Sequence, residues 1–166
     1  MADEVKIRRA DIDDIDTIVA IWNEGATRSF GEELPLATTV NLFFRERVMN
    51  LQAPFGIWLA VAGSSVMGWQ GLQPFRNNPV NECRWAESST YVSKNARNTG
   101  IGRALIRFAN KHASENGIDC VVGYIMSSNL SAAHVVETEG WVRVGHMPFT
   151  QNQNRDAAYE YWAFVP

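Results

Sequence analysis

The sequence contains little cysteine, and its two cysteines, Cys83 and Cys120, lie far apart without a CxxC spacing. Neither a disulfide framework nor a zinc site of paired cysteines is indicated, and core packing is favoured for both over a nucleophilic role. Three scattered histidines add no metal-ligand pattern. We therefore expect no metal site and a reduced, cytoplasmic protein.

Long apolar runs are also missing. The most apolar stretch, GIWLAVAGSSVMGWQGL, is interrupted by Gly-Ser-Ser at residues 63–65. The N-terminal MADEVKIRRADIDDID is charged where a signal peptide needs an apolar core. We therefore expect neither export nor a membrane-spanning segment.

Positive charge is scarce overall but concentrated in one region. The formal net charge of -3 argues against generic nucleic-acid binding. No acidic residue occurs from Ser88 to Ser114, whereas five of the fifteen Lys and Arg residues lie there. The alternative is a solvated helix face, but such faces usually mix both signs of charge. The pattern favours an anionic ligand near this region.

What the sequence does contain is enough apolar material for a core. The chain has 166 residues, of which 46% are hydrophobic and 11% aromatic, which suits one domain over residues 1–166. Periodicity predicts an α/β domain in the order strand, two helices, three strands, helix, strand, helix, two strands. Asp11 is the expected N-cap of the first helix, with Asp14 three residues later.

The most informative motif is a glycine turn between a predicted strand and a predicted helix, at residues 97–102 (RNTGIG). Free N–H groups and the positive end of a helix dipole favour an anion at such a turn. A mononucleotide P-loop is excluded, since Arg103 and Ala104 follow the second glycine instead of Lys and Ser or Thr. A dinucleotide turn is excluded because Leu105 occupies the position that needs a small residue.

The remaining pattern, R-x-x-G-x-G, resembles the pyrophosphate loop of the Gcn5-related N-acetyltransferase (GNAT) superfamily. Downstream, NLSAAHVVETEGW resembles the family pattern N-x-x-[SA]-x-x-h-x-x-x-x-G-[FWY], and RWAESSTYV resembles a run in phosphinothricin and methionine sulfoximine acetyltransferases. The resemblance covers nearly the whole chain. It implies a mixed, mostly antiparallel sheet of about seven strands, flanked by about four helices.

The resemblance also implies that acetyl-CoA is bound. Backbone N–H groups of the loop would meet the pyrophosphate, and Asn98 replaces a glycine that is common in relatives. Asparagine tolerates positive φ, so the loop should still close, and its side chain offers one more hydrogen bond. The implied cofactor-binding residues are Tyr91, Val92, Ser93, Arg97, Asn98, Thr99, Gly100, Ile101, Gly102, Arg103 and Asn129.

Direct acetyl transfer to an amine is the implied reaction, with Glu87 and Tyr91 as the catalytic residues. Glu87 would be the base; the alternative is a solvent-facing residue or a partner of Arg84. Tyr91 would form the thioester platform through its backbone, while its side chain is equally suited to the core. Val136 replaces the Tyr or His that many relatives use as general acid. Tyr124 is a weak substitute, and a thiol pKa of about 8.5 makes an acid dispensable.

The implied substrate is a small amino-acid-like amine of the phosphinothricin, methionine sulfone or sulfoximine type. Its acidic groups would need cations, for which Arg76 and Arg84 are candidates. The implied substrate-binding residues are Glu24, Arg28, Phe30, Arg76, Arg84 and Glu87.

Other interpretations remain open at this stage. The C-terminal NQNRDAAYEYW departs from the family pattern, which indicates a shifted substrate range. The acceptor amine could instead belong to a protein N-terminus, a polyamine or an antibiotic. A non-catalytic module that senses acyl-CoA is the alternative outside enzymes. Relatives suggest a homodimer.

Overall fold

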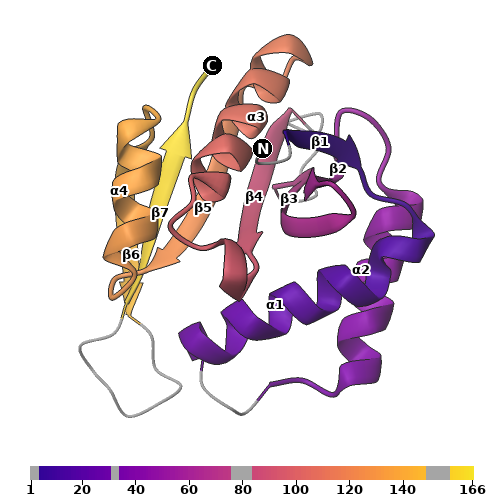
Figure 1. The fold of residues 1–166 in the computed structure, drawn as a ribbon. Coiled ribbons are helices and arrows are strands. Elements are labelled where there is room, and N and C mark those ends of the chain that lie inside the picture. The colour runs from indigo at the N-terminus through magenta and orange to yellow at the C-terminus, as the bar shows by residue number, and fades with distance from the viewer. Residues whose placement is uncertain (1–3, 31–33, 76–83, 149–157) are drawn as a thin grey trace.

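The computed structural model describes residues 4–30, 34–75, 84–148 and 158–166. Within them the chain forms seven strands and four α-helices in the predicted order (Figure 1). The elements are β1 (Val5–Arg9), η1 (Ile12–Asp14), α1 (Ile15–Phe30), α2 (Ala37–Asn50), β2 (Gly56–Ala62), β3 (Ser65–Pro74), β4 (Trp85–Val92), η3 (Lys94–Ala96), α3 (Ile101–Glu115), β5 (Cys120–Met126), α4 (Leu130–Thr138), β6 (Val142–Pro148) and β7 (Ala158–Phe164).

All seven strands belong to one sheet, with the order β1-β2-β3-β4-β5-β7-β6. Only β4 and β5 pair in parallel, and every other neighbouring pair is antiparallel. The prediction of a mixed, mostly antiparallel sheet is therefore confirmed.

Helices cover both faces of this sheet, and β2 shows how the sequence divides between them. Ile57 and Leu59 pack in the cluster that includes α1 and α2 residues. Trp58 packs in the cluster formed with α3, and Ala60 joins a smaller cluster with the start of that helix. Because successive strand residues face opposite sides, a strand buried on both faces must be apolar throughout, as GIWLAVA is.

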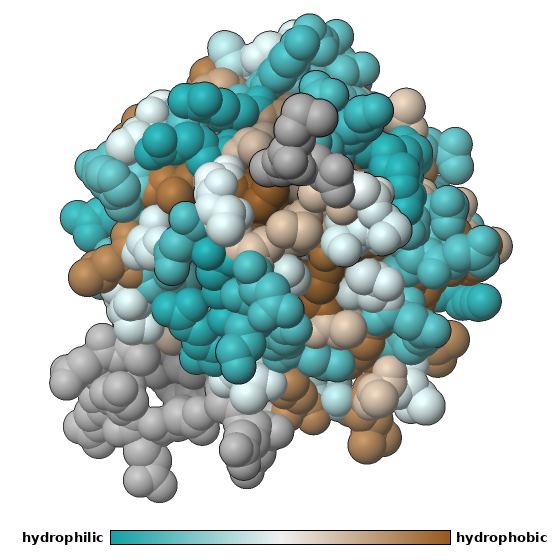
Figure 2. All heavy atoms as spheres, viewed as in Figure 1, coloured by the Kyte–Doolittle hydropathy of each residue, from teal (hydrophilic) through white to brown (hydrophobic). Residues whose placement is uncertain are grey.

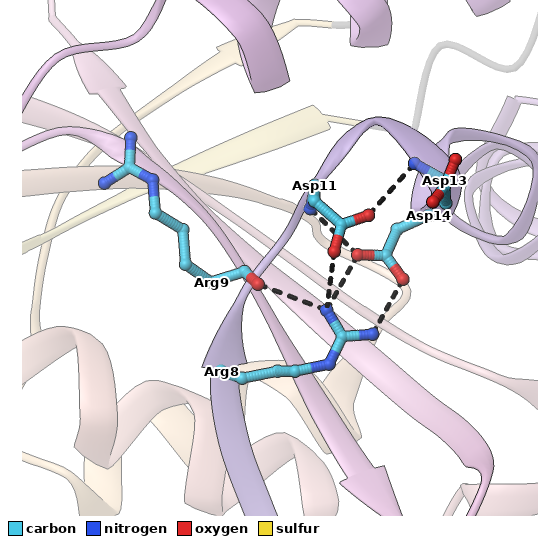
Figure 3. A network of polar contacts seen from close by, with 5 residues as sticks. All are labelled: Arg8, Arg9, Asp11, Asp13 and Asp14. Carbon is cyan, nitrogen blue, oxygen red and sulfur yellow. Dashed lines mark hydrogen bonds and ion pairs between the residues drawn. The ribbon is translucent and has the colours of Figure 1, made fainter.

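The start of the first helical segment is held by a polar network. Asp11 forms a capping box with Asp14, as predicted, although the first turn is the 3-10 helix η1. Arg8 donates two 2.8 Å hydrogen bonds to the Asp14 carboxylate and one of 3.2 Å to the Arg9 carbonyl, whereas the Arg9 side chain points away (Figure 3). The Arg8 hydrogen bonds hold the pKa of Asp14 below its ordinary value. The network ties β1 to the entry of α1.

This network predicts a pH-dependent contribution to stability. Because the folded-state pKa of Asp14 is lowered, its contribution is complete above about pH 4 and is lost as the pH falls further. We expect Asp14→Asn to lower the free energy of unfolding by about 1 kcal/mol at neutral pH, since the Arg8 partner is half-exposed. Urea unfolding should show the full difference at pH 7 and a smaller difference at pH 2.5. An equal difference at both values would contradict this account.

Helix α3 turns an apolar stripe toward the sheet. Its buried residues repeat at three and four positions: Ile101, Leu105, Ile106, Ala109 and Ala113. Most of the molecular face in Figure 2 is hydrophilic, with smaller hydrophobic patches between. No helix in the described part of the chain is long and apolar enough to cross a membrane.

Candidate active site

A cleft opens where the two parallel strands separate. β4 and β5 pair only from Trp85 opposite Cys120 to Glu87 opposite Val122, and they diverge beyond that point. A cavity of about 530 Å³ lies at this splay. Its walls come from α1, β4, the loop before α3, α3, β5, α4 and β7. The fold therefore brings the predicted glycine turn and the predicted catalytic strand to one cavity.

Most of the predicted cofactor-binding residues line this cavity. Those that do are Tyr91, Val92, Arg97, Asn98, Gly100, Gly102, Arg103 and Asn129. Three others lie beside it: Ser93 precedes η3, Thr99 bonds the Ala96 carbonyl, and Ile101 is buried in the core.

The predicted substrate residues are more dispersed. Arg28 lines the cavity, whereas Glu24, Arg84 and Glu87 do not. Arg76 and the side chain of Phe30 lie outside the described part of the structure.

The glycine turn has the backbone geometry of an anion site. Asn98 has a φ of 64° and Gly100 a φ of 90°, both left-handed. Gly100 is the N-cap of α3 and has no side chain to cap the helix. The first N–H groups of the helix therefore remain free of a side-chain cap and can donate to a ligand. A Cβ on Gly100 would meet nothing within 4 Å, and one on Gly102 only Val92 Cγ2 at 3.6 Å. The turn is open on this side and fits a pyrophosphate.

The Asn98 conformation leads to a prediction. A β-branched residue with positive φ is strained by about 1–2 kcal/mol, whereas glycine is not. We expect Asn98→Val to weaken acetyl-CoA affinity about tenfold and Asn98→Gly to weaken it less, as measured by calorimetry. Equal affinities of the Val and Gly variants would show that the left-handed conformation is not needed for binding.

Glu24 lies at the glycine turn. Its Oε2 accepts a 2.6 Å hydrogen bond from the Lys94 backbone N–H and lies 3.9 Å from an Arg97 nitrogen. The Arg97 Nε also donates to the Val92 carbonyl at 3.4 Å. Glu24 therefore connects α1 to the loop, and nothing in this geometry directs it toward an acceptor.

Arg103 is held by an acidic residue that follows α4. Glu139 lies 3.2 Å from Arg103 and 2.8 Å from Arg107, and its side chain is only 10% exposed. Arg103 also donates to Thr138 Oγ1 at 3.2 Å. These contacts fix α3 against α4 along one wall of the cavity.

Asn129 is placed at the start of α4. Its Oδ1 accepts a 3.3 Å hydrogen bond from the Ala132 N–H and so caps the helix. Its side-chain NH2 group has no partner among the described residues and remains a donor in the cavity wall. The capping role and the predicted ligand-binding role are therefore compatible.

The ring of Tyr91 belongs to the core. It stacks on Trp69 at 4.8 Å between centroids and lies against Gly25 of α1, where a Cβ would come within 2.6 Å of the ring. Burial raises the pKa of Tyr91 to about 12. Of the two interpretations of this side chain, packing is the one that the geometry supports. Tyr91 also lines the cavity.

A buried amide supports the cavity floor. Gln70 of β3 is fully buried, donates to Ser88 Oγ at 2.8 Å and accepts a hydrogen bond from Thr90 Oγ1. Ser88 and Thr90 line the cavity. Sequence reasoning missed Gln70, because its side-chain partners, Ser88 and Thr90, lie on the neighbouring strand 18 and 20 residues away.

Glu87 lies at the point where β4 and β5 separate, on the face covered by α1 and α2. It is the last residue of β4 paired with β5, and Tyr91 on the same face packs against α1. Its charge acts on Arg47 of α2 and on Tyr124 of β5. Burial, and then the charge of Glu87, raise the pKa of Tyr124, which keeps that hydroxyl protonated at neutral pH. Tyr124 lines the cavity and follows Val122, the residue paired with Glu87, by two positions. This carboxylate and this phenol therefore lie on the same face of the sheet at the splay.

The remaining candidates lie elsewhere. Arg84 forms a 2.6 Å ion pair with Asp119 just before β4 and is not available as a partner of Glu87. Val136 is buried in the core and lines the cavity. Of the histidines, His112 contacts the Pro54 carbonyl at 2.7 Å and packs on Trp58, away from the cavity lining.

Comparison with solved structures shows the same fold in several acetyltransferases. A ribosomal-protein-alanine N-acetyltransferase from Brucella melitensis has a TM-score of 0.82 at 22% identity, covering 97% of this chain and 99% of that one. A phosphinothricin acetyltransferase from Sinorhizobium meliloti, in complex with AcCoA, has a TM-score of 0.81 at 22% identity, covering 97% and 88%. An N-acetyltransferase from Staphylococcus aureus Mu50 has a TM-score of 0.83 at 20% identity, covering 98% of each chain.

The family comparison agrees with the site geometry. None of the curated protein sequences compared with this chain matched it significantly. The model of the Acetyltransferase (GNAT) family matches residues 16–141, which include the splayed strands, the glycine turn and α4. This chain therefore belongs to the GNAT acetyltransferase family.

Proposed function

We propose that this protein is an N-acetyltransferase that acetylates the primary amine of a small, amino-acid-like acceptor. The observation that carries the proposal is the position of Glu87, a carboxylate at the splay of β4 and β5 and next to the cavity. An amine that enters from the α1 and α2 side meets this carboxylate beside the strands that line the cavity.

The family uses acetyl-CoA, which supplies an acetyl group activated as a thioester. The open turn at Gly100 and Gly102 and the uncapped start of α3 suit its pyrophosphate. Asn129 lies across the cavity, where its NH2 group can bond the pantetheine part. These residues of α3 and α4 would hold the donor, and its thioester would then lie toward the splay.

The role of Glu87 follows from the charge of the acceptor. An amine arrives as an ammonium ion and must lose a proton before its nitrogen can attack. The Glu87 carboxylate takes that proton, and the nitrogen then attacks the thioester carbonyl carbon. The new C–N bond forms as the C–S bond breaks, and the second amine proton ends on the departing thiolate.

The thiolate does not need a strong acid. A thiol pKa of about 8.5 means that the leaving group is only weakly basic. Val136 offers no proton, whereas the Tyr124 hydroxyl stays protonated and lines the cavity. We assign Tyr124 as a hydrogen-bond donor at the splay, in place of the Tyr or His that Val136 replaces.

An acceptor panel tests the proposed function. Thiol release from acetyl-CoA should be measured with methionine sulfone, methionine sulfoximine, phosphinothricin, spermidine and a peptide with N-terminal Ala. We expect turnover with an amino-acid-like acceptor. Turnover confined to the peptide or to spermidine would contradict the acceptor class. Acetyl-CoA binding with no release for any amine would contradict catalysis and support a sensor.

A further inference from the structure

Arg47, a residue that sequence reasoning did not select, reaches the sheet beside Glu87. It lies in the last turn of α2, and its Nε donates a 2.7 Å hydrogen bond to Gln73 Oε1 of β3. Gln73 is the direct cross-strand partner of Glu87. Residues paired in this way project from the same face of a sheet. The Arg47 guanidinium is therefore held at the level of Glu87, on the face where the acceptor enters.

The surroundings of this guanidinium are mostly neutral. It lies 3.3 Å over the Phe43 ring, donates to the Phe43 carbonyl at 3.3 Å and bonds the neutral Gln73 amide. No carboxylate of the described residues lies within 4.0 Å of it. Burial lowers the pKa of Arg47, which the charges of Glu87 and Glu46 oppose. Burying a cation that has only neutral hydrogen-bond partners is unfavourable, unless an anion binds to it and balances its charge.

This cation decides which amines suit the site. A simple ammonium ion that approaches Glu87 is repelled by the neighbouring guanidinium. An acceptor that also carries an acidic group avoids this repulsion, because its anion neutralises the guanidinium while its amine meets the carboxylate. The pair of Glu87 and Arg47 is thus complementary to a molecule with one amine and one acid.

The strand geometry places the two groups at different points along the acceptor. Ser89 lines the cavity and precedes the acetyl platform, and Glu87 is two residues, about 7 Å, away along β4. Arg47 reaches β3, on the side of β4 opposite to β5. The acidic group would therefore lie farther from the cavity than the reacting amine, and a spacer must separate them.

We infer that Arg47 is a specificity-determining residue whose guanidinium binds an acidic group of the acceptor, remote from the reacting amine. The inference rests on the proposed function, because it concerns the acceptor side of the same site. The guanidinium is suited to a carboxylate or a phosphinate, both of which accept charge-assisted, forked hydrogen bonds. Gln73 and the Phe43 ring fix its orientation before the acceptor binds.

Matched acid and amide acceptors test this inference. Each of a series of ω-amino acids with three to six carbons, and one α-amino acid, is compared with its own primary amide in the wild-type enzyme and in Arg47→Met. We expect the wild type to prefer the longer acids over their amides by about 10- to 100-fold in kcat/KM, as for charge-assisted hydrogen bonds. Arg47→Met should lose this preference, mainly through KM for the acids, while the amides react as before.

Three controls make the outcome specific. Arg45→Met removes an exposed arginine of the same helix and should keep the preference. Arg28→Met removes the arginine that lines the cavity and so tests whether that arginine binds the acidic group instead. The acetyl-CoA dissociation constant and the thermal midpoint should not change in Arg47→Met, which excludes a folding defect.

Several results would overturn the inference. One is an acid preference that persists in Arg47→Met and disappears in Arg28→Met. Another is an equal loss for acids and amides in Arg47→Met, which would indicate a purely structural role. A wild-type enzyme that acetylates acids and amides equally would refute the inference and leave the proposed function intact. Failure of the proposed function has a different signature, namely no thiol release with any amine.

Discussion

Replacing Glu87 with Gln is expected to lower kcat/KM for the acceptor amine by about 10²- to 10⁴-fold at pH 7, the usual range for a general base. Glutamine has nearly the same size and keeps hydrogen-bonding capacity, but it cannot take the ammonium proton. Glu87 makes no ion pair with any described residue, so little structural disturbance should follow. Acetyl-CoA affinity should be retained, because the glycine turn lines the cavity and Glu87 does not.

The loss of kcat/KM in Glu87→Gln should become smaller as the pH rises. An α-amino group of a chain loses its proton near pH 8 and a side-chain amine near pH 10.4, so above these values the acceptor arrives without a proton to remove. The ratio of wild-type to variant rates should therefore fall across this range, at a pH that follows the amine tested. A steady-state thiol-release assay from pH 6 to pH 10 measures this ratio.

The control for the change in charge is Glu46→Gln. Glu46 is an exposed residue of α2 whose charge, like that of Glu87, acts on Arg47. Glu46→Gln should leave kcat within about twofold of the wild-type value, as expected for a surface substitution away from the reacting groups. A Glu87→Gln enzyme that loses less than about tenfold at pH 7 would show that another group or solvent takes the proton.

Local features of this fold are predictable because a few neighbouring residues determine each of them. Asp11 and Asp14 form the capping box that their spacing indicates. Gly63 has the positive φ that the short turn between β2 and β3 requires. Asn98 adopts the left-handed conformation expected of a residue that replaces glycine. In each case the determining atoms lie within a few residues of one another.

Contacts between distant segments could not be predicted in this way. Arg47 and Gln73 are 26 residues apart, and Glu24 and Lys94 are 70 apart. Which side chains meet depends on how α1 and α2 lie on the sheet, and helical periodicity alone does not determine that packing. The hydrogen bond that Glu24 accepts from the Lys94 backbone N–H is one such contact, and the sequence did not indicate it.

The close approach of β3 to β4 at Gly68 is another feature set by tertiary packing. Gly68 pairs with Val92 and is buried. A Cβ at this position would lie 2.6 Å from the Tyr91 carbonyl oxygen and 3.2 Å from Val92 Cα. Backbone atoms cannot rotate away as a side chain can, so a methyl group here must push the two strands apart. The displaced segment is the one that lines the cavity at the splay.

We expect Gly68→Ala to lower the free energy of unfolding by about 3 kcal/mol, at the upper end for overpacking, because backbone must move. At temperatures where the variant remains folded, kcat should fall about 10²-fold, since a displacement of about 1 Å at the reacting centre has that effect. Chemical denaturation and single-turnover acetyl transfer measure the two quantities separately. Single-turnover data also exclude a change in product release as the cause.

Gly71→Ala is the matched control, because Gly71 lies in the same strand and the chemical change is the same. Its added Cβ would meet Trp69 at 3.4 Å and other atoms only at 3.9 Å, which are ordinary contacts. Its stability should change by less than about 1 kcal/mol, and its transfer rate should stay close to that of the wild type. If both variants lose the same stability, the loss comes from replacing any glycine of this strand and not from the close approach of the two backbones. If Gly68→Ala loses stability but transfers acetyl normally, the position of Tyr91 and Val92 does not limit the chemistry.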